Sequence, residues 1–226
     1  MAKVGDFENK HRGERIVIAG NGHSLLKMDL KKINCPTFGV NRIYLHRSWQ
    51  PTYYCTESKK FCEKNWEHIL RYEGPRFKFV ANRCSQYLTT PKLGGWQRRC
   101  GKRLVWVNMP KRPVPVNFST CCHQVVCHGM NVVYMAMQLA FYMGAQEVVL
   151  IGVDFDYPDG QVAAKHFYGS QLQPGEVLDT SHKAITIEHY KYAHTLFNSG
   201  SKPRIVNATP GSKLKVFPLV KFEDLF

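Results

Sequence analysis

The chain has 226 residues, of which 44% are hydrophobic, and its 31 lysines and arginines exceed its 17 aspartates and glutamates, giving a net charge of +14. This composition excludes collagen-like and intrinsically disordered proteins, because it supplies enough apolar surface for a core. The charge indicates either an ordinary solvated basic surface or an anionic partner: a phosphorylated substrate, an anionic membrane surface or nucleic acid.

Residues 1–6 are polar and predict that the chain has no signal peptide, so we expect a cytoplasmic protein whose eight cysteines are free thiols. The longest apolar run, residues 132–143, is too short to span a bilayer. One short stretch of cysteines and histidines suggests a zinc site. It contains no Cys-x-x-Cys pair, so no metal site is expected there. Its members are Cys121, His123, Cys127 and His128.

In chain order, residues 1–13 are polar and predict a loose arm. The apolar run at 15–20 predicts a short buried strand that ends in glycine, and the turn after it leads into a short helix. Further along the first half, the pattern predicts a helix over 59–71 and strands at 37–41, 52–55 and 76–80. The stretch 82–120 is rich in glycine, proline and basic residues and predicts irregular structure with one strand at 104–107.

The second half begins with a buried helix after Gly129, because apolar residues recur there at spacings of three and four until Gly144. Residues 147–154 form a continuous apolar strand, typical of the centre of a parallel sheet. The polar stretch 155–180 is long for a connection and predicts a lid loop. A helix capped by Thr180 or Ser181 and a late strand at 204–207 follow.

This alternation of strands and helices predicts one Rossmann-like α/β domain over residues 1–226, with a doubly wound, mostly parallel sheet and the lid loop after its central strand. Ligands of such sheets bind at the carboxyl ends of the strands. That rule selects four places: the turn 20–24, Asn41, Asp154 with the loop after it, and Asn207.

The turn after the first strand is the strongest candidate for a nucleotide loop. Gly20 and Gly22 would let the backbone around Asn21 approach a ligand closely, and Ser24 would offer its hydroxyl and nearby N–H groups to a phosphate. A plain tight turn remains the alternative, because the full G-x-G-x-x-G pattern is absent.

Four further side chains surround the lid loop. Asp154 and Asp156 have the Asp-x-Asp spacing that puts two carboxylates on one face of an extended chain, either for a divalent ion or as a simple cap at the strand end. His166 and His182 flank the loop, and a histidine at a helix start is kept neutral and able to accept a proton.

Three segments resemble bacterial lipooligosaccharide sialyltransferases. Residues 18–25 (IAGNGHSL) are similar to their nucleotide-binding loop, residues 40–44 (VNRIY) to their second-strand motif, and residues 133–136 with 144–155 to their central helix and strand. Other segments resemble the broader 6-hydroxymethylpterin diphosphokinase-like group, whose members often lie among surface-polysaccharide genes. These are residues 205–214, 217–218 and 165–167.

The sialyltransferase resemblance implies roles for individual residues, and these remain expectations. Asn21, Ser24 and Asn41 would hold the donor nucleotide and sugar, and Asn131, at the start of the central helix, would lie near its phosphate. His182 would be the base that deprotonates the acceptor, with His166 as its rival. Tyr157 and Tyr168 would stabilise the leaving phosphate.

The resemblance therefore implies a nucleotide-binding glycosyltransferase that uses a CMP-sugar donor and a glycan acceptor in polysaccharide biosynthesis, with no cofactor required. Mg²⁺ on the donor phosphates, contact with an anionic membrane surface and a homo-oligomer are left open. One alternative is an Mg-ATP-dependent diphosphokinase that acts on a pterin-like alcohol, with Asp154 and Asp156 as metal ligands. The other is a basic nucleic-acid-binding module, for which no recognition motif is present.

Overall fold

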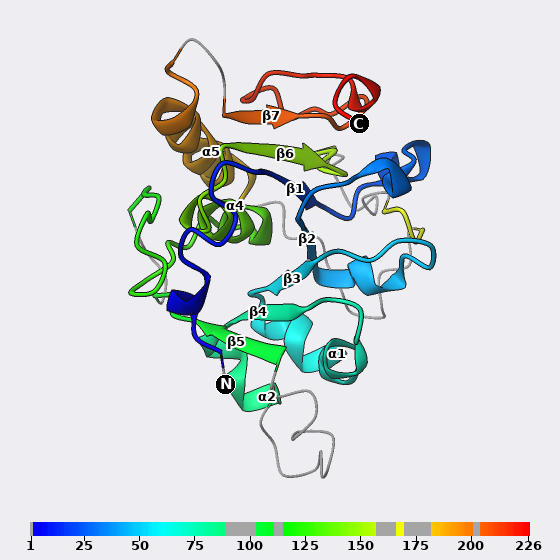
Figure 1. The fold of residues 1–226 in the computed structure, drawn as a ribbon. Coiled ribbons are helices and arrows are strands. Elements are labelled where there is room, and N and C mark those ends of the chain that lie inside the picture. Colours follow the sequence, from blue (N-terminus) through cyan, green and yellow to red (C-terminus); the bar gives the residue numbers. More distant parts are fainter. Residues whose placement is uncertain (1, 89–102, 111–114, 157–165, 170–181, 201–203) are drawn as a thin grey trace.

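The computed structural model describes residues 2–88, 103–110, 115–156, 166–169, 182–200 and 204–226 (Figure 1). Its centre is a seven-stranded sheet in the order β5-β4-β3-β2-β1-β6-β7, in which every neighbouring pair is parallel. The strands are β1 Arg15–Ala19, β2 Thr37–Val40, β3 Tyr53–Thr56, β4 Phe77–Ala81, β5 Leu104–Val107, β6 Glu147–Ile151 and β7 Ile205–Asn207. The predicted α/β class with a parallel sheet is confirmed.

The helices of the described residues are α1 Lys59–Arg71, α2 Ser85–Leu88, α4 Val132–Tyr142 and α5 Lys183–Phe197. Short 3-10 helices occupy several connections: Val4–Phe7, His23–Lys27, Leu30–Lys32, Asn41–Leu45, Asn82–Cys84 and Phe222–Asp224. Among the described residues, no helix has both the length and the apolar character that a bilayer crossing requires.

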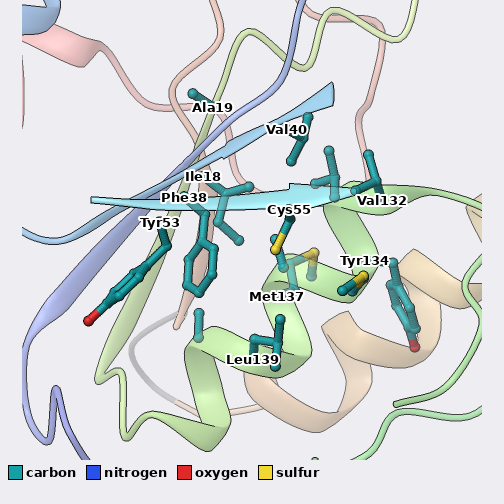
Figure 2. Close-up of a cluster of buried hydrophobic side chains, with 14 of the residues drawn as sticks. Ile18, Ala19, Phe38, Val40, Tyr53, Cys55, Val132, Tyr134, Met137 and Leu139 are labelled. Atoms are coloured by element: carbon teal, nitrogen blue, oxygen red, sulfur yellow. The ribbon is translucent and has the colours of Figure 1, made fainter. Parts of the chain in front are cut away.

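Helices cover both faces of the sheet, as a doubly wound fold requires. Neighbouring strand residues point to opposite faces. On one face, Figure 2 shows Phe38 and Cys55 of the sheet facing Met137 of α4. On the other face, the buried Lys78 donates from Nζ to the carbonyls of Ile69 and Leu70 at the end of α1, at 2.7 and 2.9 Å. The two helices therefore lie on opposite sides of the same sheet.

The N-terminal segment is not a loose arm, and that expectation was wrong. Val4 and Phe7 are buried, and the Phe7 ring makes edge contacts with Phe77 and Phe79 of β4 at centroid distances of 4.9 Å. The backbone N–H groups of residues 9, 11 and 13 also donate to the carbonyls of residues 142–144 at the end of α4. Two buried apolar residues and three backbone hydrogen bonds thus attach this polar segment to the core.

Most strand ends differ from expectation by one residue, and two further differences have local reasons. The strand expected over 147–154 ends at Ile151, because Gly152 has a φ of +60° that takes the chain out of the extended conformation. The last long helix begins at Lys183, and His182 is its N-cap residue instead of a member of its first turn. The expected caps Thr180 and Ser181 lie outside the described residues.

The strand order reverses at β1. Strands β2 to β5 extend from one side of β1, whereas β6 and β7 extend from the other. In parallel sheets the connections diverge at such a reversal, and the carboxyl ends of the two central strands border a crevice where ligands bind. The sequence places the turn 20–24 after β1, Asn41 after β2 and Asp154 after β6, so all three lie at this edge.

Candidate functional site

The turn after β1 packs directly on the turn after β6. Gly20 N donates to the Ile151 carbonyl and Gly22 N to the Gly152 carbonyl, both at 2.8 Å. A Cβ on Gly20 would lie 2.3 Å from the Gly152 carbonyl oxygen, and one on Gly22 would lie 1.3 Å from Oδ2 of Asp154. The two glycines are thus required because the turns approach each other closely. The expectation that these glycines also let the backbone approach a ligand stays a prediction.

Ser24 and Asp154 form the side-chain contact between these turns. Ser24 Oγ donates to Asp154 Oδ2 at 2.9 Å, and Ser24 N donates to Oδ1 at 3.3 Å. Burial raises the pKa of Asp154, and the two hydrogen bonds from Ser24 oppose that shift. Both donors of Ser24 therefore bond to Asp154 within the protein, and the expected contact of Ser24 with a phosphate stays a prediction. Ser24 and Asp154 position the loop.

Asn21 lies at the junction of three segments. Its Nδ2 donates to the Val40 carbonyl at the end of β2 at 3.0 Å, and its own carbonyl accepts from Phe167 N at 3.1 Å. His166 Nδ1 lies 3.3 Å from that same carbonyl. Oδ1 of Asn21 is buried and has no hydrogen-bond partner among the described residues. A buried acceptor without a partner is rare, and it is a feature that suits a ligand donor.

Asn41 is held in an unusual conformation next to Asn21. Its φ is +47°, in the left-handed region that few residues other than glycine adopt. Its Oδ1 accepts from the hydroxyl of Thr56 at the end of β3 at 3.1 Å. Backbone strain of this kind is concentrated at functional sites and persists only where neighbouring contacts hold it.

A buried cation lies beside these asparagines. Arg42 is only 8% exposed, and its guanidinium lies 5.7 Å from the ring centres of both Phe61 and Tyr168. His166 stacks on Tyr168 at a centroid distance of 4.9 Å. The segment 166–169 thus brings two expected residues, His166 and Tyr168, to the turn after β1. Arg42 was not predicted as a site residue. The feature that could have indicated it is its position directly after Asn41, the polar residue at the end of an expected strand.

His46 closes the same region from the side of β2. Its ring lies 5.4 Å from the ring of Phe167, and its Nδ1 is buried without a hydrogen-bond partner among the described residues. Burial lowers the pKa of this imidazole below its ordinary value of 6.5. A neutral His46 therefore supports the packing of Phe167, whose backbone is bound to Asn21.

The remaining expected residues lie at helix N-termini. Asn131 caps α4, since its side chain accepts from Val133 N at 2.7 Å, and His182 occupies the N-cap of α5 without a capping side-chain bond. Each helix leads into a parallel strand and runs antiparallel to it, so both N-termini lie on the side of the strands' carboxyl ends. The structure places Asn131 and His182 on the expected side of the sheet, at the ends of neighbouring helices.

Some of the expected features lie outside the described residues. Tyr157 and most of the expected lid loop, 155–180, lie outside them; residues 155–156 and 166–169 are described. Among the described residues no group of three or more His, Cys, Asp or Glu side chains could hold a metal ion. Of the short Cys/His stretch, His128 is buried, with its Nε2 2.8 Å from Arg83 Nη2, and it accepts from Met130 N.

Comparison with known proteins gives neither a matching protein-family model nor a matching curated protein sequence. Solved structures do match. The sialyltransferase CstII from Campylobacter jejuni in complex with cytidine-5'-monophosphate aligns with a TM-score of 0.55 at 14% identity, covering 92% of this chain and 85% of that one. Its complex with the substrate analogue CMP-3FNeuAc gives 0.52 at 13% identity, covering 92% and 86%.

A third structure, CST-II in complex with trisaccharide acceptor and CMP, gives a TM-score of 0.51 at 14% identity, covering 91% of this chain and 86% of that one. At these identities the similarity shows a shared fold. The sialyltransferase-like α/β fold expected from the sequence is confirmed, whereas the diphosphokinase-like grouping gains no support.

Proposed function

We propose that this chain is a sialyltransferase-like glycosyltransferase that transfers a sugar from a CMP-activated donor to a glycan hydroxyl. The observation that carries the proposal is the arrangement around Asn21 at the strand-order reversal. Its Oδ1 is a buried acceptor with no partner among the described residues, and it lies beside the strained Asn41 and the buried cation Arg42. The fold shared with sialyltransferases solved with CMP supports it. Surface-polysaccharide biosynthesis and a cytoplasmic location belong to the same proposal.

The donor would lie along this edge. Oδ1 of Asn21 accepts a hydrogen bond from the nucleotide, and Asn41 contacts the donor at the end of β2. Arg42 supplies positive charge for the phosphate, because a buried guanidinium interacts strongly with phosphate oxygens. Ser24 and Asp154 hold the turn in place for these contacts.

Transfer is proposed as a direct displacement. The acceptor oxygen attacks the anomeric carbon while the bond from that carbon to the phosphate oxygen breaks and CMP leaves. His182 takes the proton of the acceptor hydroxyl, and Tyr168, with Tyr157, donates hydrogen bonds to the leaving phosphate. His166 has a positioning role, because it stacks on Tyr168 and contacts the Asn21 carbonyl. The proposal requires no resident metal; Mg²⁺ on the donor phosphate stays a variable of the test.

The two alternatives gain less from the structure. A diphosphokinase would use Asp154 and Asp156 for Mg²⁺, but the Asp154 carboxylate accepts both hydrogen bonds from Ser24 and holds the loop. No specific feature of the described residues favours a nucleic-acid-binding module.

The test is a transfer assay with CMP-N-acetylneuraminic acid and a panel of glycan acceptors, run with Mg²⁺ and with EDTA. We expect CMP release that depends on an acceptor and a product whose mass has increased by one sugar. Asn21→Ala should reduce the rate, whereas Asn34→Ala, a matched change at an exposed asparagine, should not. Consumption of ATP with Mg²⁺, and none of the CMP-sugar, would contradict the proposal.

A further inference from the structure

A concave site lies between α5 and the segment that follows β7. Its volume is about 510 Å³, which is within the range of small-molecule pockets. The described residues that line it are Phe155, Ile187, Lys191, His194, Thr195, Lys213, Leu214, Lys215 and Val216. None of the Gly20–Ser24 turn belongs to this lining, so the pocket is separate from the nucleotide loop.

The helical wall of the pocket follows from the two-sided character of α5. Tyr190 and Ala193 are buried toward the core, where Tyr190 lies 6.1 Å from the Tyr134 ring of α4. Ile187, Lys191 and His194 recur at spacings of four and three and therefore share a different stripe of the helix. That stripe faces the segment 213–216 across the pocket.

The opposite wall is fixed by a buried hydrogen-bond network. Asn207 Nδ2 donates to Ser212 Oγ at 3.0 Å and to the Leu214 carbonyl at 3.2 Å. Lys213 N donates to the Asp154 carbonyl at 2.7 Å, and the Phe217 ring lies 5.6 Å from that of Tyr190. Because both walls are anchored to the core, the pocket is formed in the free protein.

The lining is apolar inside and positively charged at its edges. Phe155 and Leu214 are 7% and 1% exposed and belong to the hydrophobic core, whereas Lys213 and Lys215 are exposed. Lys191 also lines the pocket and pairs with Glu188 at 2.9 Å, and none of the nine lining residues is acidic. Such a combination favours a ligand that has an anionic head and a hydrocarbon body.

We propose that this pocket binds a single-chain lipid phosphate, with the hydrocarbon against Phe155, Leu214 and Val216 and the phosphate at Lys213 and Lys215. A phosphate carries up to two negative charges, which matches two neighbouring lysines on one wall. The pocket adjoins the nucleotide loop through consecutive residues, because the Asp154 carboxylate contacts Ser24 while Phe155 lines the pocket. This inference does not rest on the transferase function.

The test is calorimetric titration of the full chain with farnesyl monophosphate, farnesol and inorganic phosphate, below the concentration at which the lipid forms micelles. We expect saturable binding of farnesyl monophosphate, and binding of the other two at least tenfold weaker. The double change Lys213→Glu and Lys215→Glu should weaken the lipid phosphate roughly tenfold or more. The matched control Lys64→Glu, at an exposed lysine on α1, should leave it unchanged.

A second variant tests the apolar part of the pocket without changing its charge. Val216→Trp should fill part of the volume and weaken farnesyl monophosphate, while thermal unfolding and CMP titration show that the fold and the nucleotide site are retained. The proposal is overturned if inorganic phosphate binds as tightly as the lipid phosphate. It is also overturned if Lys64→Glu weakens binding as much as the double variant, or if CMP displaces the lipid.

Discussion

Replacing Asp154 distinguishes a carboxylate that holds a loop from one that binds a metal ion. In Asp154→Asn, the side-chain oxygen can still accept from Ser24 N, and the new NH₂ can donate to Ser24 Oγ, because a hydroxyl both donates and accepts. The change also replaces a carboxyl group whose pKa is raised by burial with an uncharged amide. We therefore expect Asp154→Asn to change the free energy of unfolding by less than about 1 kcal/mol.

Asp154→Ala removes both hydrogen bonds and leaves the Ser24 N–H without its acceptor. Hydrogen bonds to a charged group contribute about 1.5–3 kcal/mol each when buried, and the side chain is only partly buried, so a total loss of about 2–4 kcal/mol is expected. For a chain of this length that corresponds to a decrease in melting temperature of roughly 4–16 °C. CMP affinity should fall as well, because the turn that carries Asn21 loses its side-chain contact with the turn after β6 and keeps only its backbone hydrogen bonds there.

The assay is thermal unfolding of wild type and both variants, with CMP titration and transfer rates measured on the same preparations. We expect Asp154→Asn to have nearly the melting temperature and CMP affinity of the wild type. Asp154→Ala should be clearly lower in both. A metal ligand would behave differently, since an amide is a weaker ligand than a carboxylate for a hard cation. Metal-dependent activity that disappears in a stable Asp154→Asn variant would refute the positioning role.

Changes at five other residues have definite expectations. Asn21→Ala should weaken CMP about tenfold by calorimetry, because it removes a buried acceptor; equal affinities would exclude Asn21 from the site. His182→Ala should lower kcat by about a hundred- to ten-thousand-fold with CMP affinity retained, and His166→Ala should cost less; the reverse order would place the base at His166. Arg42→Gln should weaken the CMP-sugar by about ten- to a hundredfold and Arg42→Lys by less, whereas equal losses would argue against a charge contact. Burial lowers the pKa of His46 below 6.5, so the folded state disfavours the protonated ring and the free energy of unfolding should fall as the pH drops below that value. Between about pH 7.5 and about pH 5, the melting temperature of His46→Phe should therefore fall less than that of the wild type. The same pH dependence in both proteins would contradict this.

The sheet was largely predictable because its central strands are continuous apolar runs. Residues 16–19 and 148–151 are buried, so both faces of these two strands are covered, as is typical of the centre of a parallel sheet. The N-terminal segment was mispredicted, since its polar composition concealed Val4 and Phe7, which are three residues apart. Their contacts with β4 depend on tertiary structure that local pattern does not reveal.

The candidate site was predictable in place but less so in detail. The turn 20–24 and Asn41 were found because polar residues follow buried strands at one edge of the sheet. The contact between Ser24 and Asp154 joins residues 130 positions apart, so no local pattern could predict that these two expected ligand contacts satisfy each other. Similarly, Lys191 is distant in sequence from Lys213 and Lys215, and the three line one pocket only because α5 lies beside residues 213–216.

The most direct test of the proposed nucleotide site is calorimetric titration of the wild-type chain with CMP, beside CDP, UDP, GDP and ATP, with Mg²⁺ and with EDTA. The account predicts saturable binding that is tightest for CMP, persists in EDTA and is weakened by Asn21→Ala but not by Asn34→Ala. Binding of ATP only, and only with Mg²⁺, or the same CMP affinity in wild type and Asn21→Ala, would contradict a CMP-sugar site at the turn after β1.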